Sequence, residues 1–206
     1  MAVVFVSGPI QIEAGVRVFG IDPGSRFMGY GVVEDLRGRP VHVSHGVIRV
    51  DPEAPLETRL HQLHQALVAA LVVYRPDTVA VEGVFTFRNS RSALILGHAR
   101  GVALLAVAQQ SLPVFEYAPA HVKRAVGAGG AGAKDAVGRM VRTLLGIETN
   151  ARADATDALA VALCHLHRGN SILAGVNQRT APSRRSVKGL LGARLSSGSR
   201  RPEVRG

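Results

Sequence analysis

The sequence predicts an α/β fold in which helices flank a mixed sheet of five strands. Short apolar segments with strand-like patterning occur at five places, and longer segments with apolar residues at helical spacing lie between and after them. The predicted order of elements is β-β-β-α-β-α-β-α-α-α. The first three strands follow one another with short links, which favours an antiparallel meander.

The first 76 residues contain three of the predicted strands and one long helix. The strands are expected at Arg17–Ile21, Gly29–Glu34 and Val41–Val50, with a turn at LRGRP between the second and the third. Leu56–Tyr74 has apolar residues at helical spacing and contains neither Gly nor Pro. This segment therefore predicts a long helix, and Pro76 marks its end.

From residue 77 onward the chain alternates strands with helices and then continues with helices alone. The sequence DTVAVEG predicts a short buried strand ending on Glu82, and LPVFEY predicts another strand. Helices are expected at Ser90–Gln110, at PAHVKRAV, at Lys134–Leu145 and at Ala151–His167. Beyond Arg168 the periodicity fades.

Composition is typical of one folded domain with appended segments. The 206 residues are 47% hydrophobic and 4% aromatic, so aliphatic side chains are expected to fill the core. We expect an extension over 1–16, the domain over 17–168 and a basic, flexible tail over 169–206. The single cysteine, Cys164, fits a reducing cytoplasm. No apolar run reaches ~18 residues without a charge, so no membrane span is expected.

Positive charge is concentrated in the tail. The net charge of the chain is +10, and the segment after residue 167 contributes nine Lys or Arg and one acid. A basic tail on a nearly neutral domain indicates contact with nucleic acid. A solvated segment that aids solubility has the same composition, so both interpretations stay open at this point.

Two carboxylates stand at the ends of predicted strands. Asp22 follows the first apolar strand, and Pro23 holds it in extended geometry. Glu82 ends the strand after the first long helix. If these two strands are neighbours, both side chains emerge at one edge of the sheet, which is where ligand sites form in open α/β sheets. A simple surface turn is the alternative for Asp22.

A second pair of carboxylates lies in the sequence NARADATDALAVA. Asp154 and Asp157 are three residues apart, so on a helix they share one face. The helix dipole favours acids at a helix start, which accounts for Asp154 better than for Asp157. Two charges at ~5–6 Å repel by roughly 3 kcal/mol, so a cluster of all four acids would need cations. Oxygen ligands suit Mg²⁺ or Mn²⁺, and two such ions can assist phosphodiester hydrolysis.

Five ordered blocks of the chain resemble the RuvC family, the bacterial Holliday junction resolvases with a ribonuclease H-like fold. The blocks are GIDPGSRFMGYG, VEGVFTFRNSRSALILGHARG, LPVFEYAPAHVKRAV, MVRTLLG and RADATDALAVA, and they extend from about Arg17 to His167. GIDPGS alone would not identify the family, because actin-like ATPases have a similar first turn.

The resemblance implies a homodimer that places two active sites on a four-way DNA junction and cuts two strands symmetrically. It implies that Asp22, Glu82, Asp154 and Asp157 are catalytic metal ligands, with two Mg²⁺ or Mn²⁺ ions per site. It further implies a preference for a T-rich cut sequence and joint action with the RuvA–RuvB branch-migration complex. The domain over 17–168 would then be the nuclease.

The resemblance also marks residues that contact DNA. Phe85 corresponds to an aromatic residue that stacks on an unpaired base, and Lys123 and Lys134 correspond to lysines that face phosphates. The residues themselves support a DNA face, because aromatic and basic side chains alternate after Glu82 and stacking is worth ~1–3 kcal/mol per base. The further candidates on this segment are Arg88, Asn89 and Arg91. The alternative is that the phenylalanines belong to the core and the arginines to the solvated surface.

Three positions depart from the family pattern. Met28 stands where Thr is common, and Gly83 and His98 stand where Gln is frequent. None of these changes removes a carboxylate. They leave open the local hydrogen bonding and the sequence preference of cutting.

Two other functions are compatible with parts of the sequence. An actin-like ATPase would share GIDPGS, but no second phosphate-binding turn is found and the length does not suffice for two domains. A non-catalytic junction-binding module would bind DNA without cutting it, which the four acids argue against. The sequence thus predicts a metal-dependent, structure-selective endonuclease.

Overall fold

The computed structural model describes residues 15–83, 89–127, 133–148 and 152–180. The chain divides into two units, residues 1–170 and 171–206. The sheet, the candidate site and the helices packed on the sheet belong to the first unit, except for the residues of the last helix after Asn170.

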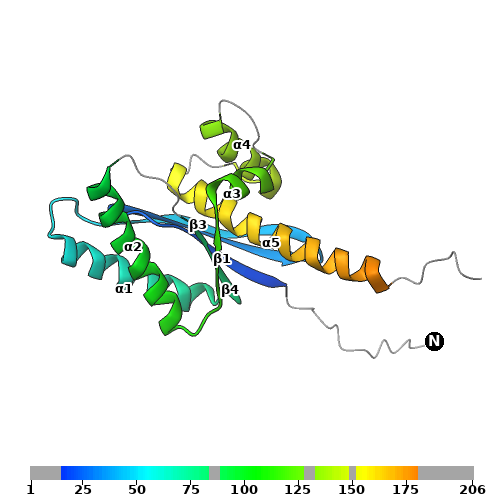
Figure 1. Ribbon diagram of the computed structural model, residues 1–206, viewed down its shortest axis with the longest axis horizontal. Helices are drawn as coiled ribbons and strands as arrows, with labels where there is room; N and C mark the ends of the chain where they lie inside the picture. Colours follow the sequence, from blue (N-terminus) through cyan, green and yellow to red (C-terminus); the bar gives the residue numbers. More distant parts are fainter. Residues whose placement is uncertain (1–14, 84–88, 128–132, 149–151, 181–206) are drawn as a thin grey trace, which may run out of the picture. The chain divides into compact units, whose positions relative to one another are not determined.

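The sheet has five strands in the order β3-β2-β1-β4-β5 (Figure 1). The first three strands pair antiparallel, whereas β4 pairs parallel to β1 and β5 pairs parallel to β4. This arrangement confirms the predicted mixed sheet and its antiparallel meander. The strands are β1 (Val16–Asp22), β2 (Phe27–Leu36), β3 (Arg39–Arg49), β4 (Thr78–Glu82) and β5 (Val114–Tyr117).

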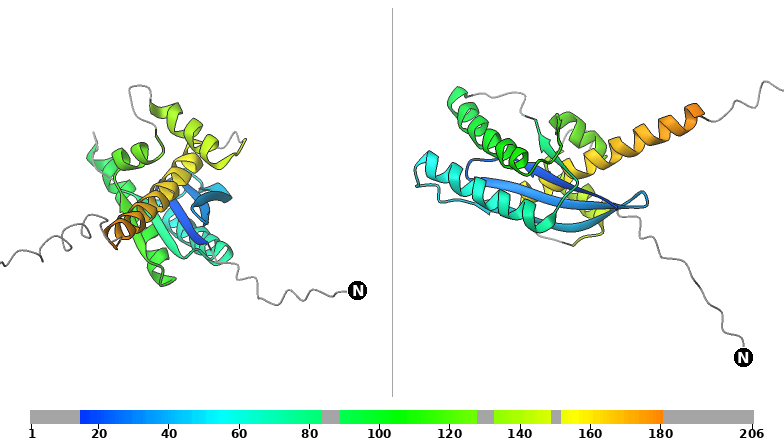
Figure 2. Two further views of the ribbon diagram at one scale, coloured as in Figure 1. Left: turned by 90° about the vertical axis from the view of Figure 1, so that its right-hand side faces the viewer. Right: turned by 90° about the horizontal axis from the view of Figure 1, so that it is seen from below.

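Helices cover both faces of the sheet (Figures 1 and 2). They are α1 (Leu56–Tyr74), α2 (Ser90–Gln109), α3 (Pro119–Ala125), α4 (Ala133–Leu145) and α5 (Ala153–Thr180). Neighbouring residues of β1 point to opposite faces, so Phe19 packs in the core formed with α1 and α2, and Val18 packs in the core formed with α3, α4 and α5. Central strand β1 therefore contributes to both cores.

Helix α5 is longer than the periodicity predicts. It runs to Thr180 instead of ending at His167. Gly169, Asn170 and Ser171 interrupt the apolar pattern and favour a break, yet the segment after them contains no proline before residue 182. The predicted helix end was therefore wrong, because weak helix formers are tolerated where a long helix is already established.

Glycines on β1 and β2 let α5 approach the sheet closely. A Cβ atom on Gly20 would collide with the backbone carbonyl oxygen of Ala158, and one on Gly29 would collide with that of Asp154. Only residues without a side chain allow a helix backbone to lie against strand backbones at this separation. The start of α5 is thereby held against the ends of β1 and β2.

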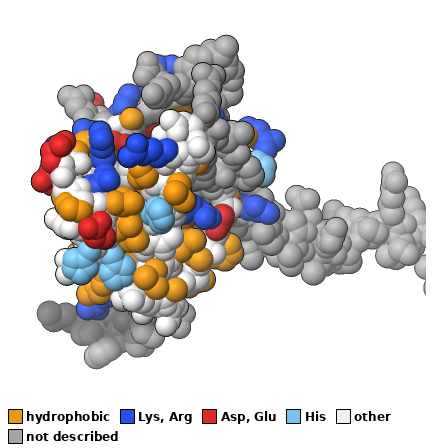
Figure 3. Space-filling view, turned by 60° about the vertical axis from the view of Figure 1, so that its left-hand side comes forward, with side chains coloured by type: hydrophobic (Ala, Val, Ile, Leu, Met, Phe, Trp, Pro, Cys, Tyr) orange, Lys and Arg blue, Asp and Glu red, His pale blue; other side chains and the backbone are white. Residues whose placement is uncertain are grey.

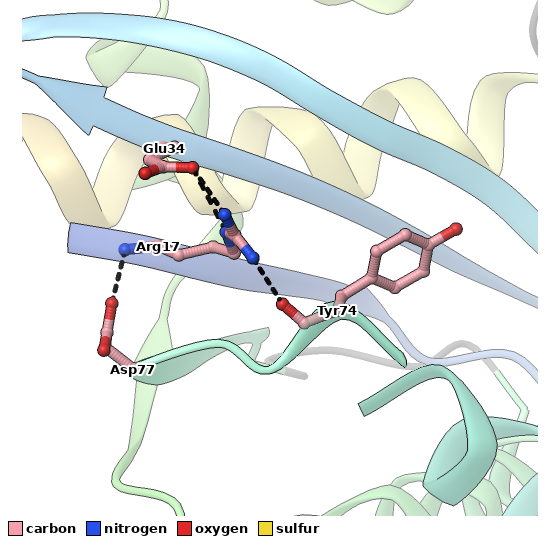
Figure 4. Close-up of polar contacts among 4 residues, drawn as sticks. All are labelled: Arg17, Glu34, Tyr74 and Asp77. Carbon is pink, nitrogen blue, oxygen red and sulfur yellow. Dashed lines mark hydrogen bonds and ion pairs between the residues drawn. The ribbon is translucent and has the colours of Figure 1, made fainter. Parts of the chain in front are cut away.

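Arg17 connects four segments at the opposite end of β1 (Figure 4). Its backbone N–H donates to the Asp77 carboxylate (2.7 Å), and its guanidinium donates to Glu34 Oε2 (2.8 and 3.2 Å) and to the Tyr74 carbonyl (2.9 Å). These contacts hold the start of β4 beside the start of β1. The pairing then runs in register up to Ile21 beside Val81.

Candidate active site

Asp22 and Glu82 lie side by side at one edge of the sheet. They are the last residues of β1 and β4, and the residues before them are paired in parallel register. Both side chains are partly buried, and their carboxyl groups lie close enough to raise the pKa of Asp22. The predicted meeting of two strand ends thus occurs in the fold.

Helix α5 brings the other two acids to the same edge. Asp154 lies in its first turn and Asp157 follows on the same face. Both interact electrostatically with Asp22, and Asp157 also interacts with Glu82. The backbone contact between Gly29 and the start of α5 explains this position, because Gly29 pairs directly with Asp22.

The pKa values of Asp22 and Glu82 are raised, because these carboxyl groups are partly buried and lie close to other acids. Burial, followed by repulsion from Glu82, Asp157 and Asp154, raises the pKa of Asp22 to about 8. Burial and repulsion from Asp157 also raise the pKa of Glu82, while Lys123 acts in the opposite direction. Without a cation, the cluster therefore retains a proton at neutral pH.

The donor chemistry of this edge fits a hard divalent cation. All four groups are carboxylates, and oxygen ligands are the ones that Mg²⁺ and Mn²⁺ take. Within the described ranges, no three Asp, Glu, His or Cys side chains stand close enough to ligate one ion together. A cation at this edge would offset the mutual repulsion that raises the pKa of Asp22.

Two positive side chains border the acidic cluster. Lys123 of α3 is exposed and lies within electrostatic range of Glu82. The Arg152 guanidinium donates to Asp154 Oδ2 at 3.1 Å and stacks over the Phe27 ring at 4.0 Å from its centroid. The sequence prediction missed Arg152 and Phe27. The basic residue two positions before Asp154 was the available signal.

The other predicted DNA contacts have different outcomes. Asn89 caps α2, since its side-chain oxygen accepts from the backbone N–H groups of Arg91 (2.9 Å) and Ser92 (3.4 Å). Arg91 is exposed in the first turn of α2. Phe85 and Arg88 lie outside the described residues, as does the side chain of Lys134. Their contacts with DNA stay predictions.

The three departures from the family pattern occupy different environments. Met28 is fully buried in the core beneath α1 and α2. Gly83 is buried, and its N–H donates to the Tyr117 carbonyl at 2.8 Å. His98 is exposed on α2. Met28 thus contributes to packing, and Gly83 continues the pairing of β4 with β5.

Two solved structures of Holliday junction resolvases share this architecture. The chain aligns with Thermus thermophilus RuvC in complex with a Holliday junction substrate at a TM-score of 0.68 and 34% identity, covering 76% of this chain and 96% of that one. The yeast mitochondrial resolvase Ydc2 aligns at a TM-score of 0.59 and 14% identity, which shows a shared fold, and covers 82% of this chain and 87% of its own. The fold is that of the ribonuclease H-like resolvases.

Sequence comparison identifies the family. The sequence model of the family described as crossover junction endodeoxyribonuclease RuvC matches residues 18–165. The chain therefore belongs to this family of Holliday junction resolvases. RuvC of Myxococcus xanthus is 64% identical over 192 residues, covering 92% of this chain and 100% of that relative. RuvC of Halorhodospira halophila is 49% identical over 158 residues, covering 76% and 93%.

These matches bear on two predictions made from sequence. Neither the actin-like ATPase nor the non-catalytic module is supported by them. The M. xanthus match takes in 92% of the chain, so it extends beyond residue 168 into the basic C-terminal segment. That segment is therefore shared with a relative, at least in part.

Proposed function

We propose that this chain resolves four-way DNA junctions in recombination and repair by cutting two strands at symmetric positions. The proposal rests on one observation above all, the convergence of Asp22, Glu82, Asp154 and Asp157 at one edge of the sheet. Membership of the RuvC family supports the choice of substrate. Thermus thermophilus RuvC has been solved with a Holliday junction substrate, so a close structural relative binds this DNA.

The four carboxylates would hold two Mg²⁺ or Mn²⁺ ions. When bound, such ions activate water and stabilise the leaving oxygen of a phosphodiester. The backbone positions of Asp22 and Glu82 are fixed, because each directly follows the last residue pair of the parallel ladder, Ile21 beside Val81. The exposed Lys123 beside Glu82 would contact a phosphate at this edge. The resemblance assigns base stacking to Phe85 and further phosphate contact to Lys134.

A junction assay tests the proposed activity. The protein is incubated with a labelled immobile four-way junction and with a duplex of matched sequence, in Mg²⁺, in Mn²⁺ or in EDTA. We expect paired nicks at symmetric positions on the junction, none on the duplex, and no cutting in EDTA. Cutting of the duplex at the same rate, or undiminished cutting in EDTA, would contradict the proposal.

Helix α2 carries a stripe of exposed small and apolar residues. Leu94 and Leu105 are 63% and 52% exposed, and Gly97 and Gly101 lie between them on the same face with open space around them. The opposite face of α2 is buried in the core through Ala99, Ala103, Ala106 and Val107. By length and composition α2 could cross a membrane, but one such helix, with 22% of its apolar window buried, is a weak indication of a span.

We propose that this stripe binds a second copy of the chain to form the homodimer. Glycines four residues apart let two helices approach closely, and the flanking leucines would then be buried in the contact. A two-fold contact uses the same surface on both copies, which a single stripe on one helix satisfies. Two copies would also supply the two active sites that paired nicks require.

Charge substitution on the stripe tests the homodimer. We expect the double change Leu94→Glu and Leu105→Glu to convert the protein to a monomer and to replace paired nicks by isolated single nicks. Val41→Glu serves as a control, because Val41 is 41% exposed on β3, outside the stripe. Light scattering after size-exclusion chromatography gives the mass. A dimer of unchanged stability in the double variant would exclude this surface.

We also propose cytoplasmic action together with the RuvA–RuvB complex. The single, buried Cys164 is compatible with a reducing compartment. The partnership follows from the family resemblance alone.

A further inference from the structure

A surface pocket of about 250 Å³ lies between α1, α2 and the loop after β1. It is lined by Ser25, Arg26, Arg59, Ser92 and Ile95. Two arginines and two serines thus face a common space without an acid among the lining residues. On the face shown in Figure 3, Lys and Arg side chains gather beside hydrophobic side chains, and Asp and Glu side chains lie next to them.

Arg59 has hydrogen-bonding capacity that the fold does not use. Its Nε–H is buried and has no hydrogen-bond partner in the described part of the chain. One Nη group reaches the Ser25 carbonyl at 3.5 Å, the outer limit of a hydrogen bond. A buried N–H without an acceptor is costly, so a ligand oxygen at this position would stabilise the guanidinium.

The walls of the pocket are held in place by the fold. The Arg26 carbonyl accepts a hydrogen bond from the Val50 N–H at 3.3 Å, which fixes the loop against the end of β3. On the other side, the Asn89 cap already satisfies the N–H groups of Arg91 and Ser92. A ligand would therefore meet arginine and serine side chains, while the helix N-terminus contributes little.

We propose that this pocket binds a backbone phosphate of the junction other than the phosphate that is cut. Guanidinium groups bind phosphate through two parallel hydrogen bonds, and hydroxyl groups donate to the remaining oxygens. Ser25 is three residues after Asp22, so the pocket adjoins the acidic edge. A phosphate held here would fix the register of the DNA strand relative to the carboxylates. This inference rests on the proposed function, since the DNA concerned is the proposed substrate.

The dependence of binding on salt tests the pocket directly. Junction binding is measured in EDTA over a series of salt concentrations for the wild type, Arg26→Gln and Arg59→Gln. The slope of log affinity against log salt is negative, and each lost phosphate contact reduces its magnitude by about 0.9. We expect this reduction in both variants, with affinity about tenfold lower at low salt.

Arg39→Gln is the matched control. Arg39 is exposed at the start of β3, at the end of the sheet opposite Asp22. Slopes for both pocket variants equal to those of the control would overturn the proposal. If Arg59→Gln proves unfolded by circular dichroism, the exposed Arg26 decides the result alone.

Two further outcomes are distinguishable. Calorimetric binding of inorganic phosphate that Arg59→Gln abolishes, with an unchanged DNA slope, would assign the pocket to a free anion and overturn the proposal. Because the binding experiment needs no cleavage, a wild-type protein that fails to nick junctions would contradict the proposed function alone. The salt slopes would still support or overturn the phosphate site.

Discussion

Asp22→Asn is expected to lower junction cleavage by roughly 100-fold or more while junction binding is retained. Asparagine keeps the size of the side chain and removes the charge that a divalent ion requires. Cleavage is measured under single-turnover conditions in Mg²⁺ or Mn²⁺, and binding is measured by gel shift in EDTA. Glu53→Gln is the control, since Glu53 is an exposed acid outside the cluster. Cleavage at the wild-type rate would overturn the assignment of Asp22.

The same variant should be more stable than the wild type when divalent ions are absent. In the folded protein the pKa of Asp22 is raised from 3.8 to about 8, so between these values the folded state holds more protons than the unfolded state. The free energy of unfolding of the wild type therefore falls as the pH rises from about 4 to 8. If only half of this pKa shift is realised, the free energy of unfolding falls by about 3 kcal/mol over this pH range.

Urea unfolding in EDTA at pH 5 and at pH 8.5 measures this difference. The advantage of Asp22→Asn should be larger at the higher pH, and Mg²⁺ or Mn²⁺ should stabilise the wild type more than the variant. If the wild type and Asp22→Asn had the same free energy of unfolding at both pH values, the proposed repulsion among the four carboxylates would be contradicted.

Gly29→Ala should lower both stability and cleavage, although Gly29 carries no functional group. The added methyl group would collide with the Asp154 carbonyl, so α5 must move away from β2. Overpacking of this kind costs about 1–3 kcal/mol. A displacement of the acids by about 1 Å can reduce the cutting rate by about 100-fold.

Gly138→Ala on α4 is the matched control for this substitution. A Cβ atom on Gly138 would meet its nearest neighbour at 3.5 Å, an ordinary contact, and alanine favours a helix interior. Unfolding by urea and single-turnover cleavage are measured for both variants. If Gly29→Ala behaved like the control, α5 would not be positioned by this close approach.

Much of the fold follows from local patterns in the sequence. The helix Leu56–Tyr74 and the strand ending on Glu82 have the predicted bounds, because apolar periodicity and Pro76 are strong local signals. Asp22 and Glu82 could be placed at one edge because each ends an apolar strand. The spacing of Asp154 and Asp157 likewise placed them on one face of a helix.

Features that depend on contacts between residues far apart in the sequence could not be predicted from local patterns. No local pattern shows that Gly29 touches the backbone of Asp154, since the two are joined only by the packing of α5 on the sheet. The pairing of Arg152 with Phe27 depends on the same packing. The pocket around Arg59 combines a loop and two helices, so it exists only in the folded chain.

The hydrogen bonds of Arg17 have a consequence at the far end of the strand. Because side chains alternate along a strand, a shift of β4 by a single residue would turn Glu82 toward the wrong side. Asp77 and Tyr74 oppose that shift through Arg17, which itself lies away from the acids. Tolerance to mutation in this protein therefore cannot be judged by nearness to the cut. A substitution at Arg17 would remove its side-chain bonds to Glu34 and Tyr74, while the backbone bond to Asp77 would remain, and it would weaken the alignment of the sheet without changing any reactive group.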